Sequence, residues 1–208
     1  MPVRDLDLIA AHLVRHAPVL SAPGSHAQAA VALVLHQPPG GVPELLFIQR
    51  AKTPGDPWSG QMALPGGRRD PGDLDLAKTA ARETLEEVGV QLDTPIGRLD
   101  DFSGSPRHAR PIVVSPFVYR VAARPELATN HEVRGTVWVP MPVLVDPGAA
   151  VHYEFRRDIP EGRFPAFHYQ GYTVWGLTYR VLGSFLRVLG SAYPALDRNR
   201  VVRDDNSQ

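Results

Sequence analysis

Three glutamates lie close together near the end of the stretch ALPGGRRDPGDLDLAKTAARETLEEVGV, residues 63–90. If this stretch is helical, Glu83 and Glu87 are one turn apart and Glu86 lies beside them. Like charges at this spacing destabilise a helix, and near its C-terminus they also oppose the macrodipole. A hard divalent cation, which prefers oxygen ligands, would neutralise that repulsion. The alternative interpretation is a solvated acidic face, since exposed glutamates are common.

A glycine turn and a helix with well-marked ends must position these glutamates. Asp73 or Asp75 can cap the start of the helix, and Gly89 can end it in the left-handed conformation. A helical wheel places Glu87 and its neighbours on a face that projects away from the core. The residues that the wheel places on the packed face are Ala77, Ala81, Thr84, Leu85 and Val88. Upstream, the glycines of LPGG allow the backbone to approach a ligand closely.

This block, residues 67–90, resembles the signature of the Nudix hydrolases, in which a glycine and an acidic residue precede Arg-Glu, Glu-Glu and a second glycine. The residues that match are Arg82, Glu83, Glu86, Glu87, Gly89 and Val90, with Thr84 in the apolar position. The interval from Gly67 to Arg82 is one residue longer than usual. The first acidic position is therefore Asp73 when counted from the glycine and Leu74 when counted from the arginine, and no role is transferred to Asp73.

The resemblance implies an α/β/α sandwich with a mixed central sheet, and hydrolysis of a nucleoside diphosphate linked to another group. It implies that Glu83 and Glu87 are the principal metal ligands and that Glu86 is a further ligand or orients water. The Gly66 carbonyl would be another ligand, and Arg82 would hold the glutamates in position. The implied cofactor is Mg²⁺ or Mn²⁺, which screens the pyrophosphate charge and acidifies bound water.

A narrower resemblance covers residues 45–67, which are similar to the segment that precedes the signature in coenzyme A pyrophosphatases. Arg50, Ala51, Gly60 and the LPGG turn fit that subgroup, whereas an arginine expected four residues before the glycine is Asp56 here. The resemblance predicts hydrolysis of coenzyme A or acyl-coenzyme A to 3′,5′-ADP and (acyl)phosphopantetheine. ADP-ribose, NADH or another nucleoside diphosphate derivative is the alternative substrate. A non-catalytic nucleotide sensor is a second class of function, disfavoured because all three glutamates are present.

Glu132 is a candidate catalytic residue, because some Nudix enzymes keep a general base in the loop before a late strand. An exposed loop glutamate is the alternative, and the neighbouring His131 could do the same work at its near-neutral pKa. The candidate substrate-binding residues are Arg50, Arg68, Trp58 and Arg107. The three arginines could meet phosphate or face solvent. The tryptophan could stack on a base or only pack its own loop.

Composition restricts the partners. The 22 basic and 22 acidic residues cancel, so the overall attraction to nucleic acid is missing. The absence of cysteine excludes disulfides and thiol chemistry and fits a reducing compartment. The apolar stretch 172–190 is interrupted by Arg180 and Arg187, and the start lacks the apolar core of a signal peptide. We therefore expect a cytoplasmic protein, monomeric or homodimeric, that binds a small molecule and no membrane.

The pattern of apolar residues predicts one domain over residues 1–208. Helices are expected at 5–15 and at about 174–189, and the runs 29–37 and 43–51 read as a hairpin. The later strands are expected at 111–122 and 133–141, with short strands and turns over 146–174 and a frayed tail at 197–208.

Overall fold

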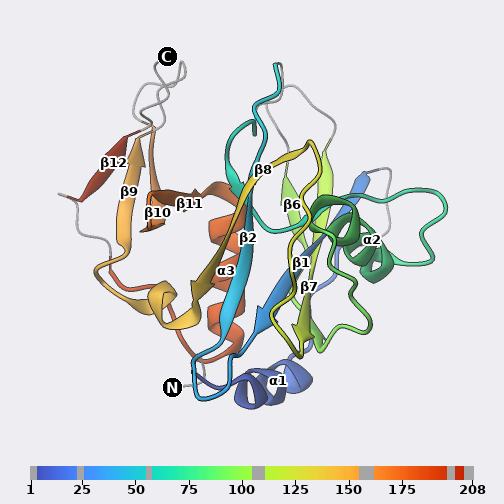
Figure 1. Cartoon of the computed structure of the whole chain (residues 1–208), viewed down its shortest axis with the longest axis horizontal. Coiled ribbons are helices and arrows are strands. Elements are labelled where there is room, and N and C mark those ends of the chain that lie inside the picture. The colour runs from blue at the N-terminus through green and yellow to red at the C-terminus, as the bar shows by residue number, and fades with distance from the viewer. Residues whose placement is uncertain are drawn as a thin grey trace.

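A mixed β-sheet with helices on both faces forms the centre of the computed structural model (Figure 1). The structure describes residues 4–22, 26–54, 58–104, 111–154, 162–195 and 200–203. The strands of the central sheet are β1 (Ala27–His36), β2 (Glu44–Arg50), β3 (Met62–Ala63), β4 (Gly66–Arg68), β5 (Gly97–Arg98), β6 (Phe102–Gly104), β7 (Ile112–Val121) and β8 (Val133–Pro140). Strands β1 and β7 are parallel, whereas β1 pairs antiparallel with β2 and β4.

The three helices lie on opposite faces of this sheet. They are α1 (Leu6–Arg15), α2 (Leu76–Val88) and α3 (Gly176–Val188), and a 3₁₀ turn, η2 (Met141–Val145), follows β8. On β1, Leu33 and Leu35 belong to the core shared with α1 and α3, whereas Ala32 and Val34 belong to the core shared with α2. Successive side chains of a strand point to opposite faces, so one strand serves both cores. The expected α/β/α sandwich is confirmed.

The ends of the helices follow local chemistry that the sequence shows. The Asp5 carboxylate accepts hydrogen bonds from two backbone N–H groups in the first turn of α1. Asp75 caps α2 by accepting a hydrogen bond of 2.8 Å from the Lys78 N–H. Gly89, with a φ of 73°, ends α2 in the left-handed conformation, and its N–H donates to the Leu85 carbonyl. The predicted boundaries of both helices are confirmed to within one or two residues.

A second sheet lies on the side of the molecule away from α2 (Figure 1). Its strands, in spatial order, are β11 (Tyr172–Trp175), β10 (Arg163–Tyr169), β9 (Ala150–Glu154) and β12 (Val201–Arg203). The prediction of a frayed tail over 197–208 is wrong for 201–203, which pair in parallel with β9. Val202 packs against a small apolar cluster on the second sheet, which gives this segment a reason to be ordered. Residues 196–199 and 204–208 lie outside the described residues.

In the described ranges, the structure shows no helix that combines the length and the apolar character needed to cross a membrane.

Candidate functional site

Gly66 and Gly67 in β4 form the surface on which two glutamates of α2 rest. The N–H of Gly66 donates a hydrogen bond of 2.9 Å to Oε2 of Glu87. A Cβ on Gly67 would collide with the carboxylate of Glu83, and a Cβ on Gly66 would collide with the Ala30 carbonyl of β1. Gly66 also has a φ of +150°, a conformation that residues with a Cβ rarely adopt. Gly67 is therefore needed for α2 to approach β4 this closely, and Gly66 for β4 to pair closely with β1.

The burial of Glu87 corrects the helical-wheel prediction. Glu87 is only 2% exposed, whereas Leu85, which the wheel placed on the packed face, is 50% exposed. The residues of α2 that are buried are Thr79, Ala80, Thr84, Glu87 and Val88. The wheel is confirmed for Thr84 and Val88 but wrong for Leu85 and Glu87, because hydrophobicity alone does not register the backbone N–H that β4 supplies to a buried carboxylate.

Burial and like charge both act on the two inner carboxylates. Burial raises the pKa of Glu87 to about 7, and the nearby charges of Glu83 and Glu132 add to the increase. The Gly66 N–H and the Arg50 charge oppose it. Burial likewise raises the pKa of Glu83, against the influence of its neighbour Arg82. The charge of Glu132 adds a smaller contribution in the same direction to both shifts.

Arg82 links two glutamates of α2, Glu83 and Glu86. Its Nη1 donates to Oε2 of Glu86 and its Nη2 donates to Oε1 of Glu83, each at 3.0 Å. The same Nη2 lies 3.0 Å from the Arg68 carbonyl of β4. The guanidinium therefore bridges two glutamates and the glycine-bearing strand, which is the arrangement that a positioning arginine requires.

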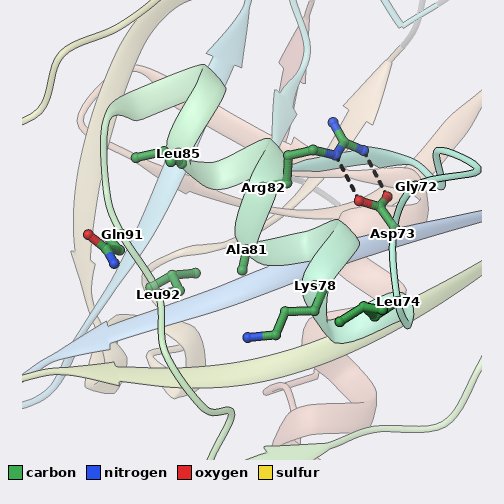
Figure 2. Close-up of a pocket in the computed structure, with 9 residues that line it drawn as sticks. All are labelled: Gly72, Asp73, Leu74, Lys78, Ala81, Arg82, Leu85, Gln91 and Leu92. Carbon is green, nitrogen blue, oxygen red and sulfur yellow. Dashed lines mark hydrogen bonds and ion pairs between the residues drawn. The ribbon is translucent and has the colours of Figure 1, made fainter.

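Asp73 lies in the site, although the sequence suggested for it only a possible role as helix cap, which Asp75 fills instead. Its carboxylate binds the guanidinium of Arg82 in a fork, with Nε–Oδ1 at 3.0 Å and Nη2–Oδ2 at 3.1 Å (Figure 2). When the signature is counted from Gly67, Asp73 occupies its acidic position. The extra residue of the loop then lies after Asp73. Leu74, the next residue, is 86% exposed, so the side chain at the extra position faces solvent.

A hollow of about 340 Å³ lies beside this ion pair, on the outer side of α2 (Figure 2). Its described lining includes Leu74, Leu85 and Leu92, together with the Asp73–Arg82 pair. Glu83 and Glu87 are not part of that lining. The hollow therefore belongs to the far face of the helix and not to the carboxylate cluster.

Arg50 and Glu132 are brought together at the ends of β2 and β8. The Ala51 N–H donates to the Glu132 carbonyl at 2.7 Å, next to an irregularity in the register between Gln49 and Arg50. Irregularities of this kind often re-aim side chains near active sites. The side chain of Glu132 is 54% exposed, and His131 beside it points a ring nitrogen to within 4.0 Å of it.

The structure gives fewer details for the other candidate substrate-binding residues. Arg68 is exposed on β4, and Trp58 is 44% exposed in the loop before β3. Arg107 and Asp56 lie outside the described residues.

The donor set fits a hard divalent cation. Among the described residues, no three acidic or histidine side chains converge closely enough to enclose a metal ion. Each carboxylate is engaged by a donor of the protein, Glu83 and Glu86 by Arg82 and Glu87 by Gly66. Yet these are oxygen donors only, and a cation would offset the repulsion that Glu83 and Glu132 exert on the buried Glu87, which the charge of Arg50 already opposes.

The family model described as NUDIX domain matches residues 26–159. The chain belongs to the Nudix family. The match includes the glycine turn, α2 and β8, and so every element that carries the carboxylate cluster.

Two relatives and one solved structure place this Nudix chain among its neighbours. An uncharacterized protein of Schizosaccharomyces pombe is 38% identical over 113 residues, which are 51% of this chain but only 34% of that protein. The uncharacterized Nudix hydrolase NudL of Yersinia pestis is 29% identical over 143 residues, or 67% of this chain and 69% of NudL. A MutT/nudix family protein of Enterococcus faecalis superposes with a TM-score of 0.55 at 17% identity, covering 89% of this chain and 69% of that one, and supports the fold. The family and its hydrolase relatives indicate a pyrophosphohydrolase.

Proposed function

We propose that the chain hydrolyses the pyrophosphate bond of a nucleoside diphosphate derivative, with Mg²⁺ or Mn²⁺ as cofactor. Glu83 and Glu87 would be the principal ligands, with Glu86 and the Gly66 carbonyl completing the set. The observation that carries this proposal is the meeting of the Glu83 and Glu87 carboxylates at the Gly66–Gly67 turn. A bound divalent ion would screen the pyrophosphate charge and acidify water.

The protein groups divide the remaining work. Arg82 holds Glu83 and Glu86 in fixed positions, so little reorganisation is needed when substrate binds. Glu132 is the proposed general base, because it lies near the inner carboxylates yet keeps a half-exposed side chain that water can reach. Its carboxylate oxygen would take the proton of the attacking water. Glu86 would orient that water.

Coenzyme A or acyl-coenzyme A is the proposed substrate, cleaved to 3′,5′-ADP and (acyl)phosphopantetheine. The support is the similarity of residues 45–67 to coenzyme A pyrophosphatases, together with the position of Arg50 beside the carboxylates. Arg50 and Arg68 would meet the phosphates, and Trp58 would stack on the base. ADP-ribose, NADH or a related compound is the alternative, in keeping with Asp56 at a position where the subgroup has arginine.

Product analysis tests the proposal. Purified protein is incubated with coenzyme A, acyl-coenzyme A, ADP-ribose, NADH and diadenosine polyphosphates, with Mg²⁺ and with Mn²⁺ separately. Release of 3′,5′-ADP from the coenzyme A substrates alone supports the full proposal. Release of AMP from ADP-ribose or NADH keeps the hydrolase and rejects coenzyme A. No turnover of any substrate with either metal would favour the nucleotide sensor.

A further inference from the structure

Thr79 is a buried residue of α2 whose hydroxyl contacts the ion pair that orients the site. It has no exposed surface, and its Oγ1 lies 2.9 Å from Oδ2 of Asp73. A threonine in a helix commonly donates to the carbonyl four residues earlier, here Asp75, which lies at 3.3 Å. A hydroxyl has one proton to donate. The Asp73 carboxylate is the closer acceptor and, being charged, a stronger one than the Asp75 carbonyl. The hydroxyl therefore donates to Asp73.

The carboxylate of Asp73 is held from three sides. Its Oδ2 accepts hydrogen bonds from the Thr79 hydroxyl and from the Asp70 N–H, each at 2.9 Å, and its Oδ1 faces Nε of Arg82. The Asp70 bond lies within the loop and moves with it. The Thr79 bond comes from the helix, as the Arg82 fork does, so it is a second link between the loop carboxylate and the helix that carries the glutamates.

We propose that the Thr79 hydroxyl is a positioning group, which fixes the Asp73 carboxylate in the rotamer that holds Arg82. The need for it follows from the extra residue in the loop, because Leu74 separates Asp73 from the cap of α2 and is turned to solvent. Without the hydroxyl, the carboxylate would keep the Asp70 N–H and the Arg82 fork but would lose its bond to the buried side of α2. The fork would then be less firmly fixed, and with it the direction of the two Arg82 bonds to Glu83 and Glu86.

The effect of Thr79 on turnover rests on the proposed function, but its effect on Arg82 does not. Thr79→Val keeps the volume of the side chain and removes the hydroxyl. The matched control is Thr84→Val, since Thr84 is equally buried on the same helix and its hydroxyl donates to the Ala80 carbonyl, at 2.7 Å. Thr79→Ser keeps a hydroxyl at this position, whereas Thr79→Ala removes it. The comparison of these two variants tests the hydroxyl even if the valine variant does not fold.

The first measurement is hydrogen exchange at the Nε–H of Arg82 by NMR in metal-free protein, with Arg82→Lys used to identify the signal. We expect exchange at least about tenfold faster in Thr79→Val and Thr79→Ala than in wild type, and wild-type exchange in Thr79→Ser and Thr84→Val. The second measurement is Mn²⁺ affinity by calorimetry, which we expect to fall about tenfold or more in the same variants, the usual range for groups that orient metal ligands.

Unchanged Arg82 exchange in Thr79→Val and Thr79→Ala would overturn the inference. Equal losses in Thr79→Val and Thr84→Val would also overturn it, because they would show a general packing effect. A wild-type protein that turns over no substrate would reject the proposed function and leave the Arg82 result to be judged separately.

Discussion

Glu87 and Gly66 are joined by a 2.9 Å hydrogen bond in which a backbone N–H of the glycine strand donates to a carboxylate that is almost fully buried. Burial disfavours the anionic form of this carboxylate and the nearby glutamates add repulsion, against the Gly66 N–H and the charge of Arg50. This residue therefore weakens the metal-free fold while offering an oxygen donor that a cation would bind.

Glu87→Gln is expected to abolish turnover and to stabilise the metal-free protein. The amide can still accept the Gly66 hydrogen bond but carries no charge into the interior. At pH 8 in EDTA, the free energy of unfolding should rise by about 1–3 kcal/mol, since one pKa unit corresponds to ~1.4 kcal/mol. Urea denaturation and product release measure the two effects. Wild-type activity in this variant with metal present would reject Glu87 as a ligand.

The stability gained in Glu87→Gln should depend on pH. The pKa of Glu87 is about 7 in the folded protein and near 4.5 when unfolded, so the folded state favours the protonated form. The contribution of Glu87 to stability is complete below pH 4.5 and is lost as the pH rises through 7. In EDTA, the advantage of Glu87→Gln should therefore be small at pH 5 and reach its maximum near pH 8. An advantage that is constant from pH 5 to pH 8 would contradict the buried-carboxylate assignment.

Gly67→Ala should disable the site with a change of one methyl group. The new Cβ would collide with the carboxylate of Glu83, so the glutamate or the strand must move. We expect kcat to fall more than about tenfold, in the range found when metal-orienting contacts are lost. Gly72→Ala is the control, because a Cβ at Gly72 meets nothing within 4 Å. Equal activity in both variants would show that the close approach of Glu83 to Gly67 is not required for catalysis.

Arg82→Lys should lower kcat/KM by more than about tenfold although the charge is kept. An ammonium cannot reproduce the fork that grips Asp73 while also reaching Glu83 and Glu86. Arg120→Lys makes the same exchange at an exposed ion pair with Asp7 and should leave the rates within about twofold. If Arg82→Lys behaves like this control, the guanidinium geometry is not required.

Glu132→Gln should separate catalysis from metal binding. Loss of a general base lowers the rate by about 10²–10⁴, and we expect the Mn²⁺ affinity to stay within about threefold of wild type. His131→Ala, at the adjacent exposed position, should retain near-normal kcat. A pH profile of kcat for both variants completes the test. If His131→Ala produces the larger loss, the base is the histidine and the assignment of Glu132 is wrong.

The parts of the fold that depend on local chemistry were predictable from the sequence. The caps at Asp75 and Gly89 follow from residue type, and the strands around Val31 and Val114 follow from apolar runs. The grouping of Glu83, Glu86 and Glu87 on one helix follows from spacing. The position of Arg82 beside two of these glutamates agrees with what the Nudix resemblance implied.

Contacts between distant segments were not predictable in the same way. The burial of Glu87 depends on a donor from β4, which lies 21 residues earlier in the chain. The role of Asp73 depends on how the loop accommodates Leu74. Counting along the sequence allows either Asp73 or Leu74 at the acidic position of the signature. The pairing of Val201–Arg203 with β9 needed a partner strand that no local pattern in the tail indicates.

The pairing of β12 with β9 also has a consequence for how the protein behaves in solution. β12 is a strand of three residues, and it covers the hydrogen-bonding edge of β9 at the margin of the second sheet. A long uncovered edge is a template for strand addition between molecules, and a short terminal strand blunts it. Removing the chain from residue 200 onward would expose that edge far from α2. The shortened protein should keep its carboxylate cluster and yet self-associate.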